Sequence, residues 1–145
     1  MLPPLGRAAH QADGSLLARL SQNEYLALAG AATAAPMGFP GFTLGDENEL
    51  GLCPVPRFAA NVWFAVVGDP SAELFAKLCG VDLRPKRFAD HTTAQTIVAR
   101  VSAVVIRDDL AGVLRYHLLV DRTMATYVRD VLDDALAEFG APAPG

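Results

Sequence analysis

Hydrophobic and polar positions are most regular in the second half of the chain. The run 61–67, NVWFAVV, is aromatic and β-branched and ends at a glycine, which is typical of a buried strand. Apolar residues then recur at three- and four-residue spacing over 72–79, which predicts a helix of about ten residues with one buried face. Asp69 is suited to cap this helix with Pro70 at its first position, and Gly80 is suited to a left-handed C-cap.

More strands follow between 94 and 120. The segment 94–107, AQTIVARVSAVVIR, contains too many β-branched residues for a comfortable helix, and it predicts one bent strand or two short strands. The segment 108–112 predicts a turn into a strand over 114–120. The simplest structure for these residues is an antiparallel hairpin.

The last predicted element is an amphipathic helix between Thr123 and Phe139, where apolar residues follow a helical stripe. Asp121 or Thr123 is suited to cap its N-terminus, and Gly140 is suited to end it. We expect the tail, 141–145, to fray.

The first half of the chain is less regular. The segment 30–57 contains glycines and prolines at short intervals, which disfavours a long helix and predicts an ordered loop with at most a short strand. Upstream, two apolar runs at 16–20 and 24–29 are separated by Ser, Gln and Asn. They are compatible with a hairpin or with a broken helix.

Together these elements predict one domain over 1–145, with an irregular N-terminal half (1–60), a regular core (61–140) and a tail. The order is strand, helix, strand, strand, helix, and the N-terminal segment offers one more pairing strand. Because helices and strands do not alternate strictly, we expect an α+β fold. Its form would be ferredoxin-like split βαβ layers, with an antiparallel or mixed sheet and two helices on one face.

Composition narrows the classes of function. Of the 145 residues, 52% are hydrophobic and 19% are charged, so the chain can bury a core and has apolar surface left over for a partner. The formal net charge of −4 disfavours nucleic-acid binding, which depends on Lys and Arg neutralising phosphates.

The two cysteines and the lengths of the apolar runs indicate where in the cell the protein is expected. Cys53 and Cys79 form no CxxC pair, so neither a disulfide framework nor a zinc site is indicated. The apolar runs are too short to span a membrane, and the N-terminus does not resemble a signal peptide. We therefore expect a cytoplasmic protein without a membrane partner.

The three histidines show no metal-binding spacing. His117 falls within a predicted strand, where a solvated or hydrogen-bonded core imidazole is the favoured interpretation. His91 lies in a polar loop beside Asp90, where a proton-transfer role is the minority interpretation, and His10 lies in a segment expected to be mobile. No HxH, HxxxH or HExxH pattern is present, so a local metal site is not supported.

Other reactive side chains also have structural explanations. The pair at 108–109 fits a hairpin turn, and the pair at 133–134 fits the solvated flank of a helix. Ser71 and Ser102 lack a nucleophile elbow. Cys79 lies on the apolar stripe of its helix, where a thiol acts as a small hydrophobe, and Cys53 has no close basic neighbour to activate it.

Two short segments could bind anions. The glycines between 38 and 51 match neither GxGxxG nor a P-loop, so a nucleotide fold is not indicated. The basic cluster at 84–87 is best explained as a solvated turn, with docking to an acidic surface or a polyanionic cofactor tail as the alternative.

The chain is richer in aromatic residues than its loops require. Trp63 and Phe64 are expected in the core. For Phe39, Phe42 and Phe58, partner burial and local packing are equally good explanations.

Three phrases in the second half carry a family resemblance. The segment 77–83 reads KLCGVDL, 94–96 reads AQT, and 138–140 reads EFG. In this order, within 62–140, they resemble the C-terminal part of the gamma subunit of heterotetrameric sarcosine oxidase.

The resemblance implies an accessory subunit related to the aminomethyltransferase (folate-binding) fold. It implies larger alpha- and beta-type flavoprotein subunits as partners, with FAD, FMN, NAD and tetrahydrofolate bound there and none bound by this chain alone. It also implies sarcosine or a related N-methyl amino acid as the substrate of the whole complex.

The first hypothesis is therefore a non-catalytic gamma-type subunit that stabilises a flavin-dependent oxidase and that can form a homo-oligomer in isolation. The alternative is a free-standing folate- or pterin-binding one-carbon module. A third hypothesis is an enzyme acting through His91 and Asp90. Under the first hypothesis we expect no catalytic residue and no metal ligand in this chain, and the sequence assigns no cofactor-binding residue.

Overall fold

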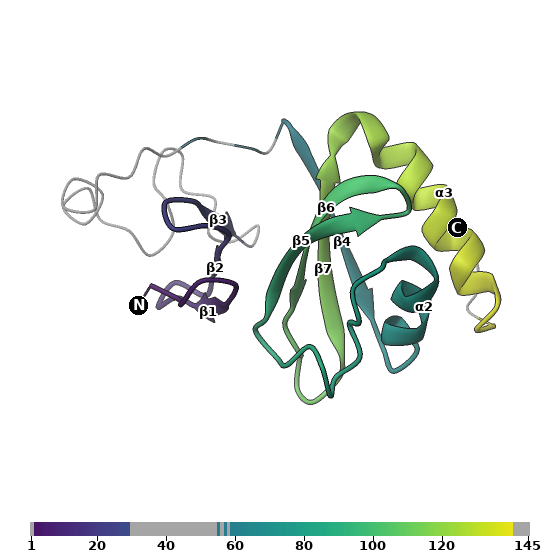
Figure 1. The fold of residues 1–145 in the computed structure, drawn as a ribbon, viewed down its shortest axis with the longest axis horizontal. Helices are drawn as coiled ribbons and strands as arrows, with labels where there is room; N and C mark the ends of the chain where they lie inside the picture. Colours follow the sequence, from purple (N-terminus) through teal and green to yellow (C-terminus); the bar gives the residue numbers. More distant parts are fainter. Residues whose placement is uncertain (1, 30–54, 56, 58, 141–145) are drawn as a thin grey trace. The chain divides into compact units, whose positions relative to one another are not determined.

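The computed structural model describes residues 2–29, 55, 57 and 59–140 (Figure 1). Cys53 and Phe39, Phe42 and Phe58 lie outside these residues, as does the tail. The chain divides into two compact units, Met1–Pro56 and Arg57–Gly145.

The first unit contains a three-stranded antiparallel sheet in the order β1-β2-β3. Its strands are β1 (Ala8–His10), β2 (Leu16–Arg19) and β3 (Tyr25–Leu28). The hairpin alternative for the two apolar runs is confirmed, and the expectation of irregular structure over 1–60 is wrong for these described strands. The short connections explain this arrangement, because consecutive strands joined by a tight turn pair with each other.

The second unit contains a four-stranded sheet in the order β4-β7-β6-β5, and every neighbouring pair is antiparallel. Its strands are β4 (Asn61–Val67), β5 (Thr93–Val98), β6 (Val101–Arg107) and β7 (Arg115–Asp121). The expected α+β class is confirmed, with the antiparallel alternative. The N-terminal segment does not supply the additional pairing strand that we expected, because its strands form the separate sheet of the first unit.

Tight turns set the register of the sheet. The segment 94–107 forms two strands rather than one bent strand, because Ala99 and Arg100 turn the chain with φ values of 50° and 67°. Ala111 and Gly112, with φ values of 50° and 80°, make the equivalent turn between β6 and β7. Two consecutive residues with positive φ give the turn whose twist matches an antiparallel pair.

Two helices and a 3₁₀ turn complete the second unit. They are α2 (Ser71–Leu78), η2 (Arg122–Met124) and α3 (Ala125–Ala137). The Asp121 carboxylate accepts a hydrogen bond from the Thr123 N–H at 2.9 Å and so caps η2. It does not cap α3 as predicted, because η2 intervenes and the N-cap of α3 is Met124, without a side-chain hydrogen bond. No helix among the described residues is long and apolar enough to cross a membrane.

The ends of α2 differ from the expectation. No side chain caps its N-terminus, so Asp69 does not act there as predicted. Its C-terminus has an extended residue, Cys79, with φ −134°, and Gly80 is not in the left-handed region. The reason is that Cys79 continues into an antiparallel bridge with Val98 of β5, which requires extended backbone.

The core lies on one face of the four-stranded sheet, where α2 and α3 both pack (Figure 1). Alternation along β7 places Tyr116, Leu118 and Val120 on this face, each at most 1% exposed. Phe64 packs against the same core, as expected, but Trp63 points to the opposite face and is 44% exposed. The prediction of a core Trp63 is therefore wrong, because neighbouring residues of a strand face opposite sides.

Tyr116 connects the core to the loop after α2. Its ring makes an edge-to-face contact with Phe75 at a centroid distance of 5.3 Å, and its hydroxyl donates a hydrogen bond to the Leu83 carbonyl oxygen. Burial raises the pKa of Tyr116 to about 12. The phenol therefore stays neutral and hydrogen-bonded through the whole neutral range.

We expect Tyr116→Phe to lower the free energy of unfolding by about 1–3 kcal/mol, because the buried Leu83 carbonyl would lose its partner. Urea denaturation followed by circular dichroism measures this change. Equal midpoints for the two proteins would contradict the role assigned to the hydroxyl.

The same variant tests the raised pKa. A tyrosine in the unfolded chain loses its proton near pH 10, whereas Tyr116 in the folded chain keeps it to about 12. Above pH 10 the unfolded state therefore binds fewer protons, and wild-type stability should fall as pH rises from 10 to about 12. This fall should be shallower in Tyr116→Phe, and identical pH profiles would argue against the assignment.

Candidate functional site

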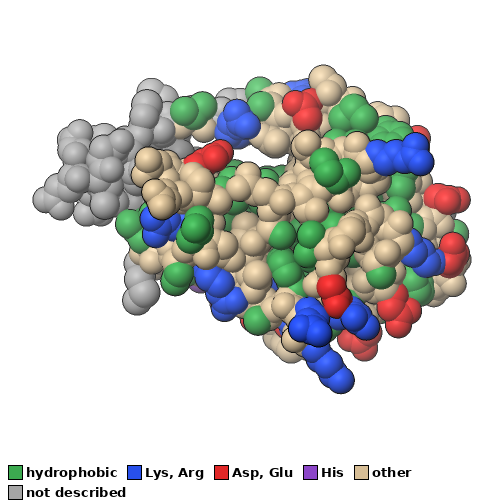
Figure 2. All heavy atoms as spheres, viewed as in Figure 1, with side chains coloured by type: hydrophobic (Ala, Val, Ile, Leu, Met, Phe, Trp, Pro, Cys, Tyr) green, Lys and Arg blue, Asp and Glu red, His purple; other side chains and the backbone are tan. Residues whose placement is uncertain are grey.

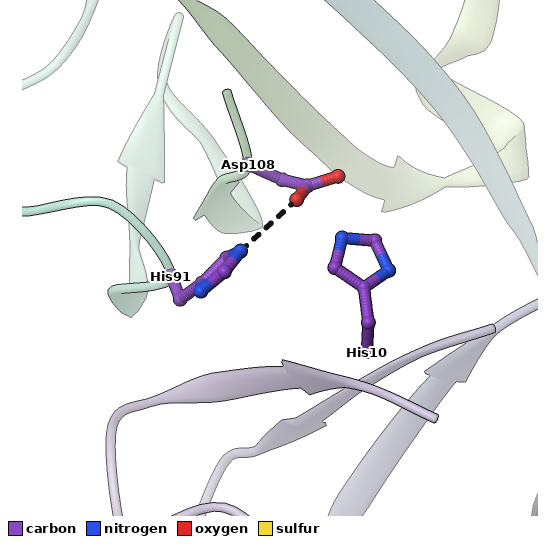
Figure 3. Close-up of side chains that lie close together, drawn as sticks. All are labelled: His10, His91 and Asp108. Carbon is purple, nitrogen blue, oxygen red and sulfur yellow. Dashed lines mark ion pairs between the residues drawn. The ribbon is translucent and has the colours of Figure 1, made fainter. Parts of the chain in front are cut away.

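The second face of the four-stranded sheet carries a polar network centred on Asp108. This residue directly follows β6 and is only 1% exposed. Arg115 of β7 pairs with its carboxylate and also donates from Nε to its backbone carbonyl at 2.8 Å. His117 Nε2 lies 3.1 Å from Oδ2, and His91 Nε2 lies 3.3 Å from Oδ1, as Figure 3 shows for the latter pair. Three cationic or protonatable groups thus surround one buried carboxylate.

Asp108 was expected in a hairpin turn, but it is buried and lies before the turn itself. The turn lies further on, where Leu110 and Val113 exchange two backbone hydrogen bonds of 2.9 Å. The Asp108 N–H donates to the Arg115 carbonyl oxygen at 2.9 Å, so Asp108 still extends the β6–β7 ladder. The positive charge of Arg115 compensates the free-energy cost of burying the Asp108 carboxylate.

Trp63 of β4 contacts His117 and indicates which ring nitrogen of that residue carries the proton. The indole Nε1 lies 3.0 Å from His117 Nδ1, and the two rings meet edge to face at 5.3 Å. An indole N–H can only donate a hydrogen bond, so Nδ1 must accept it. The ring proton of neutral His117 therefore sits on Nε2 and is donated to Asp108. Of the two structural interpretations offered for His117, a solvated or a hydrogen-bonded buried imidazole, the structure shows the second, and the residue is 5% exposed.

His91 reaches the same carboxylate from the loop before β5. Its backbone has φ 59°, a left-handed conformation that is uncommon for a residue with a side chain. Its N–H donates to the Arg107 carbonyl oxygen at 3.0 Å and to Asp90 Oδ1 at 2.9 Å. Asp90 Oδ1 also accepts from the Asp109 N–H at 3.0 Å, so Asp90 links this loop to the end of β6.

The imidazole of His91 lies closer to Asp108 than to Asp90, whose Oδ2 is 3.9 Å from Nε2. Sequence reasoning considered His91 with Asp90 and missed Asp108. The register of the β5–β6 hairpin contains the signal, because pairing Thr93 with Ile106 places position 91 opposite position 108. Chemically, this pair can hold or exchange a proton.

A second ion pair stabilises the neighbouring loop. Arg107 forms a two-pronged pair with Asp109, at 3.0 and 2.6 Å, and donates to the Phe88 carbonyl oxygen at 2.8 Å. The guanidinium lowers the pKa of the Asp109 carboxyl, and the carboxylate raises the pKa of Arg107. This pair anchors the loop between α2 and β5 to the end of β6.

The remaining sequence candidates lie elsewhere in the structure. Asp133 pairs with Arg129 at 3.7 Å on α3, as a solvated helix flank would. Cys79 is partly buried, with Sγ 3.8 Å from Thr96 Oγ1. Ser71 is buried, Ser102 is exposed, and His10, which was expected in a mobile segment, lies in β1.

The basic cluster at 84–87 is partly neutralised. Asp82 accepts two hydrogen bonds from the Arg84 guanidinium at 2.8 and 2.7 Å, which lowers the pKa of Asp82 to about 2. Figure 2 shows blue and red side chains intermixed on the face in view, without a large patch of one sign.

The β4 edge of the sheet presents apolar surface. On its outer face Trp63 is 44% and Val67 is 55% exposed. On the helix face, a groove of about 360 Å³ runs between β4 and α3. Its lining includes Phe64, Leu132 and Leu136. Among the described residues, both features adjoin a strand that has a neighbouring strand on one side only.

We expect Asp108→Asn to lower the free energy of unfolding by about 3 kcal/mol, because Arg115 would keep a partly buried charge without its counter-ion. The matched control is Asp82→Asn, which breaks a two-pronged pair on the surface and should change stability much less, because solvent screens that pair. Chemical denaturation of both variants gives the comparison. Similar losses of stability in the two variants would contradict the assignment of Asp108 as the buried centre of the polar network.

Trp63→Phe should leave the proton of neutral His117 on Nε2, because the Asp108 carboxylate still accepts from that nitrogen, while Nδ1 loses the indole donor. Nitrogen-15 NMR of the imidazole should show the Nε2–H form in both proteins, with the Nδ1 resonance shifted in the variant. Val67→Ala, on the same strand face, should leave the Nδ1 resonance unchanged. A wild-type ring protonated at Nδ1 would refute the assignment.

Comparison with solved structures shows which known fold this chain resembles. Neither a family model nor a curated protein sequence matches this chain. Among solved structures, a chain of heterotetrameric sarcosine oxidase from Corynebacterium sp. U-96, in complex with pyrrole 2-carboxylate, matches with a TM-score of 0.73. The match covers 99% of this chain and 70% of that chain, at 21% sequence identity. The resemblance seen in the sequence is thus confirmed in three dimensions, and the chain has the fold of a chain of heterotetrameric sarcosine oxidase.

Proposed function

We propose that the chain is an accessory, non-catalytic gamma-type subunit of a multisubunit flavin-dependent oxidase of sarcosine or a related N-methyl amino acid. The observation that carries this proposal is the match in fold over 99% of the chain. The chain would assemble with larger alpha- and beta-type flavoprotein subunits in the cytoplasm. FAD, FMN, NAD and tetrahydrofolate would be bound by those subunits, and none by this chain alone.

The side chains of the second unit are compatible with this role. Asp108 has an arginine and two histidines within hydrogen-bonding or ion-pairing reach, and His117 is held in one tautomer by Trp63. Such a network fixes the position of β4, β7 and the loop before β5. Hydride transfer from a secondary amine would take place on a flavin of another subunit, to which this chain contributes buried area and fixed geometry.

The apolar side chains on the β4 edge supply the surface for assembly. A standard interface buries about 800 Å² on each partner and has an apolar centre. Trp63 is well suited to such a centre, since it is 44% exposed and already oriented by its hydrogen bond to His117.

The test is purification of the tagged full chain from its native host, with the partners identified by mass and the visible spectrum recorded. We expect stoichiometric larger subunits, flavin absorption and oxidation of an N-methyl amino acid. Depleting this chain should lower the thermal midpoint of the remaining subunits while leaving their flavin content unchanged. Purification of this chain alone, without flavin, would contradict the proposal.

A substitution separates the accessory role from the enzyme hypothesis. If His91 transferred a proton in catalysis, His91→Gln would lower kcat of the assembled complex by about 10²–10⁴-fold. Under the accessory role we expect less than about a twofold change in kcat. The folate alternative has its own readout, because tetrahydrofolate binding to the isolated chain would quench the fluorescence of Trp63, the single tryptophan.

A further inference from the structure

The strand β4 has a full set of unpaired backbone groups along one side. The Gly68 N–H donates to Leu114 and the Arg122 N–H donates to the Ala60 carbonyl oxygen, so even-numbered residues of β4 face β7. The N–H and C=O groups of Trp63, Ala65 and Val67 therefore point away from the sheet. Within the part of the chain that the structure describes, nothing pairs with them.

We propose that β4 is a self-pairing edge, on which a second copy of this chain adds its own β4 in antiparallel register to form a continuous eight-stranded sheet. The strand is seven residues long and contains no proline, lysine or other charged residue, which are the usual means of blocking an edge. A two-fold axis at Ala65 would pair Trp63 with Val67 of the other copy, and Ala65 with its own equivalent.

Side chains on both faces of the seam fit this register. On the outer face, Trp63 would lie beside Val67 of the second copy, an aromatic and β-branched pair of the kind that stabilises adjacent strands. On the helix face, Phe64 would lie beside Val66 of the second copy. The groove of about 360 Å³ between β4 and α3 borders this contact, and α3 lines it with Leu132 and Leu136 together with Arg129 and Asp133.

The charges around β4 favour antiparallel self-pairing. Arg57 and Arg122, both exposed, lie near its start together with Asp121. Asp69 and Glu73, both exposed, follow its end, where Arg115 is already paired with Asp108. Antiparallel pairing brings the start of one β4 next to the end of the other, so a net positive region would meet a negative one.

The opposite edge of the sheet is less available for pairing. Cys79 forms an antiparallel bridge with Val98 at the end of β5, and the Ala99 N–H donates to the Leu78 carbonyl oxygen at 2.8 Å. The chain after α2 therefore already occupies part of that edge. This asymmetry selects β4 as the pairing strand and gives β5 as an internal control.

The test measures the mass of the full chain in solution by sedimentation or light scattering. The concentration series reaches about 100 µM, at which the proposed dimer should be populated. We expect a species of twice the 15.3 kDa monomer mass that dissociates on dilution. Ala65→Pro removes an outward N–H at the seam and should weaken dimerisation by at least tenfold.

Two matched charge variants locate the contact. Val67 on β4 and Ile97 on β5 are both β-branched and are 55% and 53% exposed. Val67→Asp should weaken dimerisation at least tenfold, whereas Ile97→Asp should leave it within about twofold. A monomer at every concentration overturns the proposal, and so does a dimer that Ile97→Asp disrupts and Val67→Asp does not. The dimer and the subunit interface proposed above use the same edge of β4, so the dimer is proposed for the chain in isolation, where no flavoprotein subunit occupies that edge. The purification test of the complex does not depend on it.

Discussion

The arrangement of the second unit depends on the two-residue period of its strands. Tyr116, Leu118 and Val120 of β7 enter the core under α2 and α3, and the residues between them must face the other side. Two helices on one face can cover only that face. The other face of the sheet and its β4 edge must therefore be stabilised in a different way.

The structure meets this requirement with a polar network rather than with a third helix. Asp108 is held by Arg115, His117 and His91, and Trp63 connects the network to the edge strand. A fully paired buried carboxylate adds little to stability compared with an apolar core, but it restricts side chains to one geometry. A rigid strand with exposed apolar residues is a suitable docking element, since less order has to be imposed when a partner binds.

The sequence was sufficient for the parts of the fold that depend on local chemistry. The strand at 61–67 and a helix within 123–139 follow from periodicity, and both are seen, although α3 covers only Ala125–Ala137. Gly140 has the positive φ, 70°, expected beyond the end of a helix. The three phrases between 77 and 140 were sufficient to identify the fold relative. The hairpin turn at 99–100 was left open, because neither Ala nor Arg is typical of a position with positive φ.

The candidate site could not be read in the same way, because its members are far apart in sequence. Trp63 was assigned to the core since large apolar residues usually lie there, and the face of a strand depends on register. Asp108 was placed in a turn because two consecutive acidic residues usually are solvated. Only the pairing of position 91 with 108 across a hairpin brings the histidine and the carboxylate together.

Residue-resolved amide hydrogen exchange of the full chain tests the central claim most directly, because each amide of β4 reports which side of the strand is occupied. The account predicts slow exchange at Val62, Phe64 and Val66 under all conditions. Trp63, Ala65 and Val67 should exchange rapidly in dilute chain and become protected when a partner binds. Equal protection of all six amides in the dilute monomer would show that the edge is already covered and would contradict the account.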